Sequence, residues 1–158
     1  MPFFSVLLHI EEKPYQLGRL LETLRPADEV LVVDHSHDAA IRKVAHQYGA
    51  KLVPSVPGVD LGGYALHCKH DWVLCMQAME SLSEALEAAL FEWKRTQPEP
   101  INSFSVPVRE QNHGQWRLLD PETRLVNRCS VHWQGKLPPT MTTATALTGY
   151  LLRFLDPE

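Results

Sequence analysis

The segment Asp71–Leu90, DWVLCMQAMESLSEALEAAL, decides the fold that we predict for this chain. Its apolar run Trp72–Met76 predicts a buried strand, and the polar turn Gln77–Glu80 follows that strand. Ser81 and Glu84 then have the spacing of a capping box, which predicts the start of a helix. In open α/β sheets, ligands bind outside the carboxyl ends of the strands. We therefore expect a functional site at the turn.

The rest of the amino-terminal part alternates strands with helices. Apolar runs predict strands at Phe3–Ile10, Glu29–Asp34 and Lys51–Val56, and the first run is apolar enough for a central strand covered on both faces. Apolar residues at helical spacing predict three buried helix faces. These faces comprise Leu17, Leu20, Leu21 and Leu24 in the first helix, Ile41, Val44, Ala45 and Tyr48 in the second, and Leu86, Ala89, Leu90 and Trp93 in the third. This order of elements predicts a parallel sheet with right-handed crossovers.

Local signals predict where the helices begin and end. Pro14 is expected early in the first helix, where its missing N–H costs nothing. Asp38 is expected to cap the second helix, and Gly49 to follow it in the left-handed conformation. The connection 57–70 is expected to contain a helical turn near 64–68.

The carboxyl-terminal part is less regular. Alternating residues predict a strand at Ser103–Arg109, and Asn112–Gly114 predicts a turn. Short strands are expected at Trp116–Leu119 and Arg124–Asn127. The last prediction is a helix over Thr142–Phe154, with its inward residues at Leu147, Tyr150, Leu151 and Phe154.

Composition excludes several classes of partner. The chain has 158 residues and a net charge of −4, so there is no electrostatic case for binding nucleic acid or an anionic membrane. No apolar run approaches the roughly 20 residues of a membrane span. We expect no signal peptide, because the first residues lead directly into a predicted strand. The three cysteines are too few and scattered for a disulfide framework. We expect a cytoplasmic protein with no nucleic-acid partner.

Four segments resemble family 2 glycosyltransferases, the nucleotide-diphospho-sugar transferases of GT-A fold. They are Asp71–Leu90, SVLLHIEEKPYQLGRLLETL at 5–24, ADEVLVVDHSHDAAIRKVAHQYGAKLV at 27–53, and RLVNRCSVHWQGKLPP at 124–139. Each motif is weak alone, and their order and spacing together are specific. The resemblance implies an α/β, GT-A-like, mostly parallel sheet flanked by helices, with a shortened mixed carboxyl-terminal section. It also implies one domain, with a nucleotide-binding half at 1–95 and a shortened acceptor-side half at 101–158.

The resemblance also assigns roles to positions. In the family, the loop after the first strand and the aspartate that ends the second strand hold the base and ribose; here these are Glu11, Glu12 and Asp34, with Ser36 in the following loop. The family's D-A-D aspartates hold a divalent metal on the diphosphate, and a later His-Glu motif activates the acceptor. Here D-A-D-E reads Gln77-Ala78-Met79-Glu80, and the His-Glu pair falls on Pro138-Pro139.

These departures change the expected chemistry. An amide brings no charge and a thioether is a poor ligand for Mg²⁺ or Mn²⁺, so we predict no metal at 77–80 and no cofactor. The candidate nucleotide-sugar-binding residues are Glu11, Glu12, Asp34, Ser36, Gln77 and Glu80, and Glu80 is also the one weak catalytic candidate. We predict a glycosyltransferase-like protein with weak or no activity. The alternative is a non-catalytic binding or interaction module with a protein partner.

Each candidate has a local alternative. Asp34 could instead cap the turn after its strand, and Glu80 could be a favourable charge at a helix amino terminus. His35 and His37 could contact a diphosphate or be solvated loop residues. A second group has spacing loosely compatible with a metal, although surface side chains are the simpler interpretation: His67, Cys68, His70 and Asp71. Two arginines, Arg124 and Arg128, could meet phosphates or form a solvated face.

Overall fold

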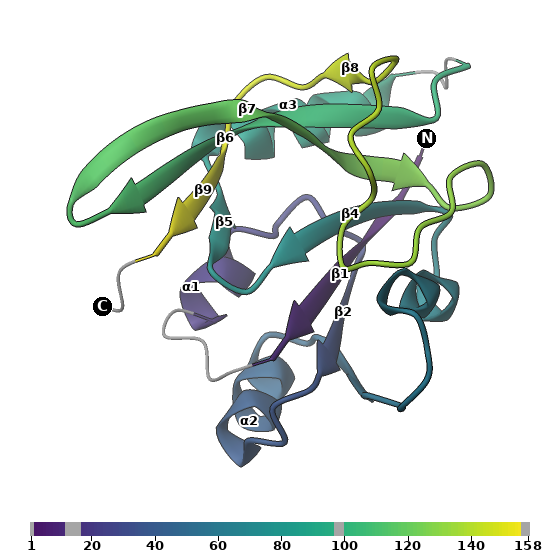
Figure 1. The fold of residues 1–158 in the computed structure, drawn as a ribbon, viewed down its shortest axis with the longest axis vertical. Helices are drawn as coiled ribbons and strands as arrows, with labels where there is room; N and C mark the ends of the chain where they lie inside the picture. The colour runs from purple at the N-terminus through teal and green to yellow at the C-terminus, as the bar shows by residue number, and fades with distance from the viewer. Residues whose placement is uncertain (1, 12–16, 97–99, 156–158) are drawn as a thin grey trace.

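The computed structural model describes residues 2–11, 17–96 and 100–155, which form a nine-stranded sheet with helices packed on it (Figure 1). The strand order is β3-β2-β1-β4-β7-β6-β9-β5, and β8 pairs with β6. The strands are β1 (Phe4–Ile10), β2 (Glu29–Asp34), β3 (Lys51–Pro54), β4 (Trp72–Gln77), β5 (Glu80–Leu82), β6 (Ser103–Asn112), β7 (Gln115–Asn127), β8 (Thr145–Ala146) and β9 (Leu151–Phe154). The helices are α1 (Leu17–Glu22), α2 (Ala39–Gln47), α3 (Glu84–Arg95) and the 3₁₀ helix η1 (Leu61–His67).

The first four strands of the order form a parallel half of the sheet. β1 lies between β2 and β4, and β2 lies between β1 and β3, all in parallel. The prediction that the apolar runs at 3–10, 29–34 and 72–76 are neighbouring inner strands is therefore confirmed. Every residue of β1 is buried because both faces of the strand are covered.

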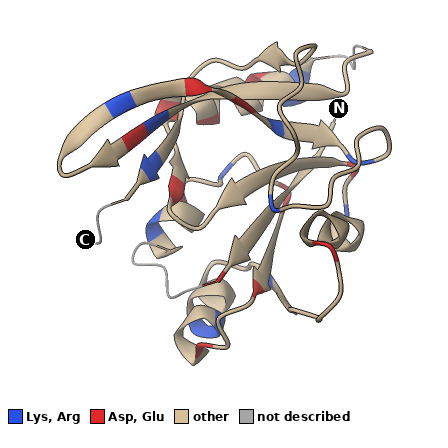
Figure 2. Ribbon diagram, in the orientation of Figure 1, with Lys and Arg blue, Asp and Glu red and all other residues tan. Residues whose placement is uncertain are grey.

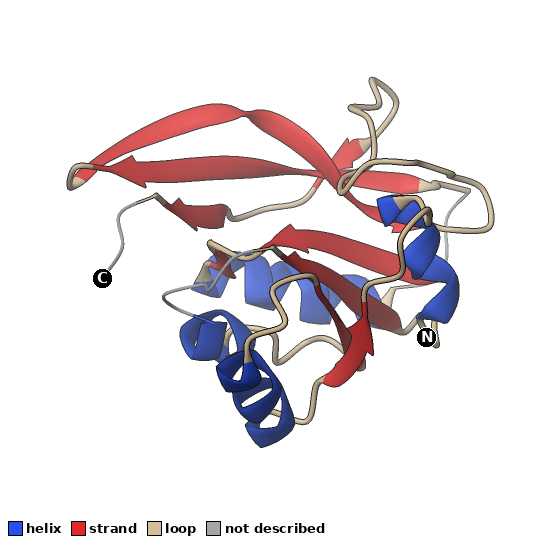
Figure 3. Cartoon of the chain, turned by 60° about the horizontal axis from the view of Figure 1, so that its bottom comes forward, coloured by secondary structure: helices blue, strands red, loops and turns tan. Residues whose placement is uncertain are grey.

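The two faces of the parallel half are covered by different elements. Side chains at alternate positions of β1, such as Val6 and Leu8, pack with the buried residues of α1, α2 and α3. The intervening Leu7 packs on the opposite face with Tyr64 and Ala65 of η1. Figure 3 shows α1, α2 and α3 together on one side of the sheet. The predicted faces of these helices are confirmed except at Tyr48, which is 41% exposed and donates its hydroxyl hydrogen to Glu22.

The predicted helix ends are partly correct. Asp38 caps α2 by accepting from the backbone N–H of Ala40, and Gly49 has a φ of 70°, as expected. The capping box at Ser81 is wrong. Ser81 is buried in β5, where it pairs with Leu152, and the N-cap of α3 is Ser83, whose Oγ accepts from the N–H groups of Leu86 and Tyr150. The prediction for Pro14 lies outside the described residues.

The carboxyl-terminal section is a mixed extension of the sheet. In it β7 is antiparallel to β4 and β6, and β9 is antiparallel to β5, whereas β8 and β9 are parallel to β6. The predicted turn at 112–114 joins β6 to β7, with positive φ at His113 and Gly114, and the two short strands expected at 116–119 and 124–127 are parts of the single strand β7. The predicted final helix is wrong. Leu151–Phe154 is instead a strand held between β6 and β5, where backbone pairing on both edges outweighs the helical spacing of its apolar residues. These observations agree with the predicted fold class, α/β with a mostly parallel, helix-flanked sheet and a mixed carboxyl-terminal section.

Candidate functional site

The sheet brings three predicted site residues to one edge. In the register of β1 and β2, Ile10 lies opposite Asp34, and in that of β1 and β4, His9 lies opposite Gln77. Asp34 ends β2 and Gln77 ends β4, and these two strands flank β1, which is followed by Glu11. This is the edge where open α/β sheets bind ligands. Glu12 lies outside the described residues.

Asp34 shapes the loop that follows β2. Its Oδ1 accepts from the backbone N–H of Ser36 at 2.9 Å and from the Ser36 hydroxyl at 2.6 Å. The Ser36 oxygen in turn accepts from the N–H of Asp38 at 3.2 Å. The local turn role considered for Asp34 is therefore present. Its second oxygen, Oδ2, receives no hydrogen bond from the residues that the structure describes, so the carboxylate keeps an acceptor for another partner.

His9 is a site residue that the sequence reasoning missed. Its Nε2 lies 3.0 Å from the carbonyl oxygen of Leu61, which only accepts, so Nε2 carries the hydrogen and Nδ1 is left to accept from His35 Nε2 at 3.0 Å. Burial, together with the smaller effect of the neighbouring His35, lowers the pKa of His9 to about 4. The signal in the sequence was a single imidazole in an otherwise apolar strand.

The two loop histidines have different environments. His35 is half-buried, and its ring stacks on His9 and meets Tyr64 edge to face, so it is part of the site's architecture. His37 is exposed, with a φ of 57°, which agrees with the solvated-loop interpretation. The loop therefore directs one imidazole inward and the other outward.

A lysine that the sequence reasoning also missed pairs with Glu11. Lys136 Nζ lies 2.6 Å from Glu11 Oε2, and this hydrogen bond lowers the pKa of Glu11. Lys136 belongs to the loop after β7, which approaches η1 where the N–H of Gly62 donates to the carbonyl of Gln134. A Cβ on Gly62 would lie 2.0 Å from the Trp133 carbonyl oxygen, so this close approach requires glycine. The pair links the end of β1 to the carboxyl-terminal section.

The turn after β4 does not suit a divalent metal. Gln77 offers an uncharged amide, and Met79 is a 46% exposed thioether. The remaining carboxylate, Glu80, is fully buried and already fully engaged: Oε1 accepts from Arg124 and from the Gln77 N–H, and Oε2 accepts from Arg124 and Arg153. Among the described residues, no three His, Cys, Asp or Glu side chains lie together as a metal site. The residues present do not fit the metal that the family resemblance implies.

Glu80 and Arg124 form a buried ion pair. Two guanidinium nitrogens of Arg124 lie 2.7 Å from the two oxygens of Glu80, and both side chains have no exposed area. Arg124 also donates to the carbonyl oxygen of Cys75 at 3.0 Å. Both interpretations of Arg124, as a phosphate contact and as a solvated residue, are therefore wrong. The helix-terminus interpretation of Glu80 is wrong as well, because Glu80 lies on β5 and closes this pair.

The ion pair is the centre of a larger network on strands of the carboxyl-terminal section. Arg153 bonds Glu80 at 3.1 Å, Glu122 at 3.0 Å and Glu110 at 3.3 Å. Burial opposes the charge on Arg153 and Arg124, yet the carboxylates around them raise the pKa of both guanidinium groups. Figure 2 shows acidic and basic residues gathered along β5, β6, β7 and β9. We call these residues and the exposed partner Arg117 the ion network: Glu80, Glu110, Arg117, Glu122, Arg124 and Arg153.

The second metal candidate, at 67–71, has another explanation. Arg128 pairs with Asp71 at 3.2 Å and donates to the carbonyl oxygens of Ala65 and Cys68, so it fixes the connection between η1 and β4. The interpretation of Arg128 as part of a solvated face is therefore wrong. Burial raises the pKa of the Cys68 thiol to about 12, which keeps it protonated. No metal cluster forms there among the described residues.

Within the described ranges 2–11, 17–96 and 100–155, no helix has the length and apolarity that crossing a membrane requires.

The chain was compared with protein families, curated proteins and solved structures. No family model and no curated protein matches the chain. A crystal structure of a mycobacterial protein matches with 15% identity and a TM-score of 0.61, over 98% of this chain and 65% of that one. Glucosyl-3-phosphoglycerate synthase from Mycobacterium tuberculosis matches with 18% identity and a TM-score of 0.52, over 71% of this chain and 45% of that one, in a complex with phosphoglyceric acid. The same enzyme with Mn²⁺, uridine diphosphate and glucosyl-3-phosphoglycerate matches equally well over 70% of this chain.

The chain spans less than two-thirds of the length of these solved structures. At such low identities the likeness shows the fold alone. This chain has a glycosyltransferase-like α/β scaffold.

Proposed function

We propose that this protein binds a nucleotide or nucleotide sugar at the carboxyl edge of β1, β2 and β4, without a metal, and transfers sugar weakly or not at all. The observation that carries the proposal is the position of Asp34. Its carboxylate ends β2 in the glycosyltransferase-like scaffold, is held by Ser36 through Oδ1, and keeps Oδ2 free of bonds from the described residues. An imide N–H of a uracil base is a suitable donor to that oxygen.

The similar enzyme supports this ligand class. Several of its solved complexes contain uridine diphosphate or uridine-diphosphate-glucose, and most of those also contain Mn²⁺. On this chain, nucleotide binding would use Asp34 together with Ser36, Gln77 and Glu11, which lie on the same edge. Glu80 leaves this candidate set, because both of its oxygens are engaged within the ion network. Glu12, outside the described residues, stays a candidate from the sequence.

Weak or absent transfer follows from the missing charges. A metal ordinarily neutralises the diphosphate and activates it as a leaving group. Gln77 and Met79 supply no charge for that purpose, and Lys136 is already paired with Glu11. The positions of the acceptor-activating pair, Pro138 and Pro139, contain no ionisable group. Electrostatic stabilisation of the transition state is usually the largest catalytic contribution, so its loss predicts little activity.

Titration calorimetry with uridine, uridine diphosphate and uridine-diphosphate-glucose, with and without Mn²⁺, tests the proposal. We expect saturable binding that Mn²⁺ changes less than twofold. Asp34→Asn should keep the turn, because an amide oxygen can accept the bonds from Ser36, and should weaken binding of all three ligands about tenfold, a typical effect of losing one charge-assisted hydrogen bond. Asp38→Asn is the matched control, since asparagine also caps helices. If none of the three ligands binds saturably, the nucleotide site is refuted.

The second candidate is a non-catalytic interaction module on the same scaffold. The turn 77–80 lacks the two metal-binding aspartates of the family motif, and this lack also favours a protein that does not catalyse transfer. The restoration variant Gln77→Asp with Met79→Asp separates the two. Met79 is 46% exposed and Gln77 half-buried, so the new carboxylates need not be fully desolvated. If the nucleotide edge is intact, the double variant should gain Mn²⁺-dependent affinity for uridine diphosphate. A folded variant without that gain would favour the interaction module.

A further inference from the structure

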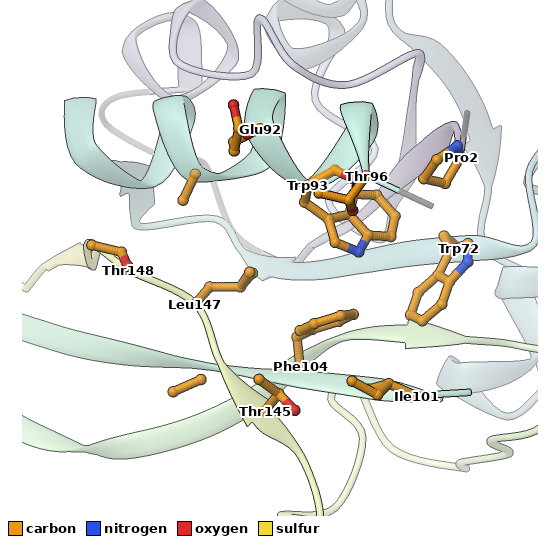
Figure 4. A pocket seen from close by; sticks show the side chains of 12 residues that line it. Pro2, Trp72, Glu92, Trp93, Thr96, Ile101, Phe104, Thr145, Leu147 and Thr148 are labelled. Carbon is orange, nitrogen blue, oxygen red and sulfur yellow. Dashed lines mark hydrogen bonds between the residues drawn. The ribbon is translucent and has the colours of Figure 1, made fainter. Parts of the chain in front are cut away.

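A pocket lies at the amino-terminal end of the parallel strands, opposite the carboxyl edge at which we propose that a nucleotide binds. We call that carboxyl edge the nucleotide edge. Its volume is about 350 Å³, within the range of small-molecule sites, and it opens between α3, β6 and the segment that contains β8 (Figure 4). Trp72, which begins β4, lines this pocket, whereas Gln77, which ends the same strand, belongs to the nucleotide edge. Five residue steps along a strand span roughly 16 Å, so the two sites are separate.

Aromatic rings form one wall of the pocket. Trp72, Trp93 and Phe104 contact one another, with ring centroids 5.2, 5.7 and 5.9 Å apart. Ile101 and Leu147 add apolar surface, and Figure 4 shows all five side chains around a common space. These residues lie against the main core and yet are only partly buried, except Phe104, so the core opens to solvent here. Such a wall favours a ligand with an apolar body.

The mouth of the pocket favours positive charge. Glu92, on α3, is the one charged side chain among the twelve residues that line the pocket, and no described basic residue pairs with it. The neighbouring Lys94 points elsewhere, donating to the carbonyl of Pro26 and to Asp28. The faces of indole and phenyl rings also attract cations. The carboxylate and the rings therefore select the same sign of charge.

Hydroxyl groups complete the mouth. Thr96, Thr145 and Thr148 line the pocket from three different segments. The Thr96 hydroxyl donates to the carbonyl of Trp93 at 2.7 Å, so its oxygen retains lone pairs that accept from an N–H group. These hydroxyl oxygens, from different sides of the pocket, could accept from the N–H donors of an ammonium group.

From these contacts we propose a second ligand site, distinct from the nucleotide edge, that takes an organic ammonium ion with an apolar body. The body lies against Trp72, Trp93 and Phe104, and the ammonium group lies at the mouth beside Glu92. This arrangement rejects anions of the same shape, because the mouth contains a carboxylate and no cation among the described lining residues. The inference goes beyond the proposed nucleotide binding and does not depend on it.

Three probes with one phenylbutyl body test the charge selectivity: 4-phenylbutylamine, 4-phenylbutanol and 4-phenylbutyrate. Calorimetry gives the affinities, and tryptophan fluorescence together with saturation-transfer NMR reports the contact with the rings. We expect the amine to bind about tenfold more tightly than the acid, with the alcohol between them. Uridine diphosphate should not displace the amine. Equal binding of amine and acid, or no saturable binding of the amine, would overturn the proposal.

Variants locate the site. Glu92→Gln should reduce the difference between amine and acid to less than threefold, while Glu84→Gln, an exposed glutamate on the same helix outside the pocket, should leave it unchanged. Ala89→Phe should fill the pocket and abolish binding of all three probes. If that variant fails to fold, Glu92→Gln still decides, because Glu92 is exposed and its replacement leaves the core intact. Unchanged selectivity in Glu92→Gln would contradict the assigned site.

Discussion

The two halves of the sheet share one apolar core but differ in their buried charges. In the parallel half, β1 is buried along its whole length and its neighbours β2 and β4 have buried apolar centres, with helices on one face and η1 on the other. In the mixed half, β5, β6, β7 and β9 contribute the ion network, whose centre is fully buried, beside apolar core residues such as Val106 and Leu125. The network contains three arginines and three glutamates, so its formal charges cancel. Apolar burial dominates in the parallel half, whereas the mixed half combines apolar burial with paired charge.

The turn 77–80 is the boundary between the halves. Gln77 ends β4 in the parallel half, and Glu80 begins β5 in the mixed half. A hydrogen bond from the Gln77 N–H to Glu80 Oε1 joins them at 2.8 Å. The residue that resembled a remnant of a metal motif is therefore engaged in holding the two halves together. This bond, together with the ion network, fixes the turn between the halves.

The largest expected effect is on the ion network. Arg124→Met would leave the Glu80 carboxylate buried without its bidentate partner, which should lower the free energy of unfolding by about 3–5 kcal/mol. Urea denaturation measures the change. Arg117→Met is the control, because its side chain is 72% exposed and its pair with Glu110 should contribute less than about 1 kcal/mol. A loss below about 1 kcal/mol for Arg124→Met would show that the buried pair is not central to stability.

The matching test in the parallel half removes apolar volume. Leu74 lies on β4 between β1 and β7, with no exposed area. Leu74→Ala should lower the free energy of unfolding by about 3 kcal/mol, from lost burial and the cavity left behind. Raising the ionic strength should leave the Leu74→Ala loss unchanged, because the substitution removes no charge. A loss that depends strongly on salt would contradict the apolar account of this half.

The difference between the halves also explains what the sequence could predict. Continuous apolar runs identify β1, β2 and β4, and the cap at Asp38 and the glycine at 49 identify the ends of α2, because these signals are local. Arg124 and Arg153 are far from Glu80 along the chain, and no local pattern shows that they meet. The segment 142–154 has helical spacing, yet it forms β8 and β9 because strands far away in sequence offer their edges.

The candidate site shows the same limits. The sequence placed Asp34 and Gln77 correctly at strand ends, since parallel strands end at a common edge. It missed His9 because one imidazole in an apolar strand gives no sign of a partner, and it missed Lys136 because the pair with Glu11 joins residues far apart. Both Ser81 and Ser83 are of a residue type that caps helices. The pairing of β5 with β9 places Ser81 in a strand and leaves Ser83 to cap α3.

A pH-dependent effect of intermediate size is expected at His9. Its pKa of about 4 in the folded protein lies below its ordinary value of 6.5, so the unfolded state binds the proton more readily between these values. Stability from the neutral His9 is therefore complete above about pH 6.5 and is lost as the pH falls towards 4. We expect a loss of about 2 kcal/mol across this window.

Urea denaturation from pH 7.5 to 4 measures this loss. The variant His9→Gln should have a flatter profile than the parent protein, whereas His132→Gln, at an exposed position, should have the parent's profile. The groups near His9 are His35, Glu11 and Lys136, and of these the pKa of Glu11 is lowered, away from the window. Identical profiles for His9→Gln and the parent would contradict the buried neutral imidazole.

The smallest expected effect is at the exposed ion pair between Glu11, which follows β1, and Lys136 of the carboxyl-terminal section. Lys136 and Glu11 are 2.6 Å apart, closer than Arg124 and Glu80, yet their side chains are 37% and 51% exposed and not fully buried. Water and salt screen such a pair, so Lys136→Met should change the free energy of unfolding by less than about 1 kcal/mol, and 0.5 M salt should remove most of that change. Urea denaturation at two salt concentrations measures it beside Arg124→Met. A loss of several kcal/mol for Lys136→Met would mean that paired charge also holds the parallel half, and the contrast between the two halves would then fail.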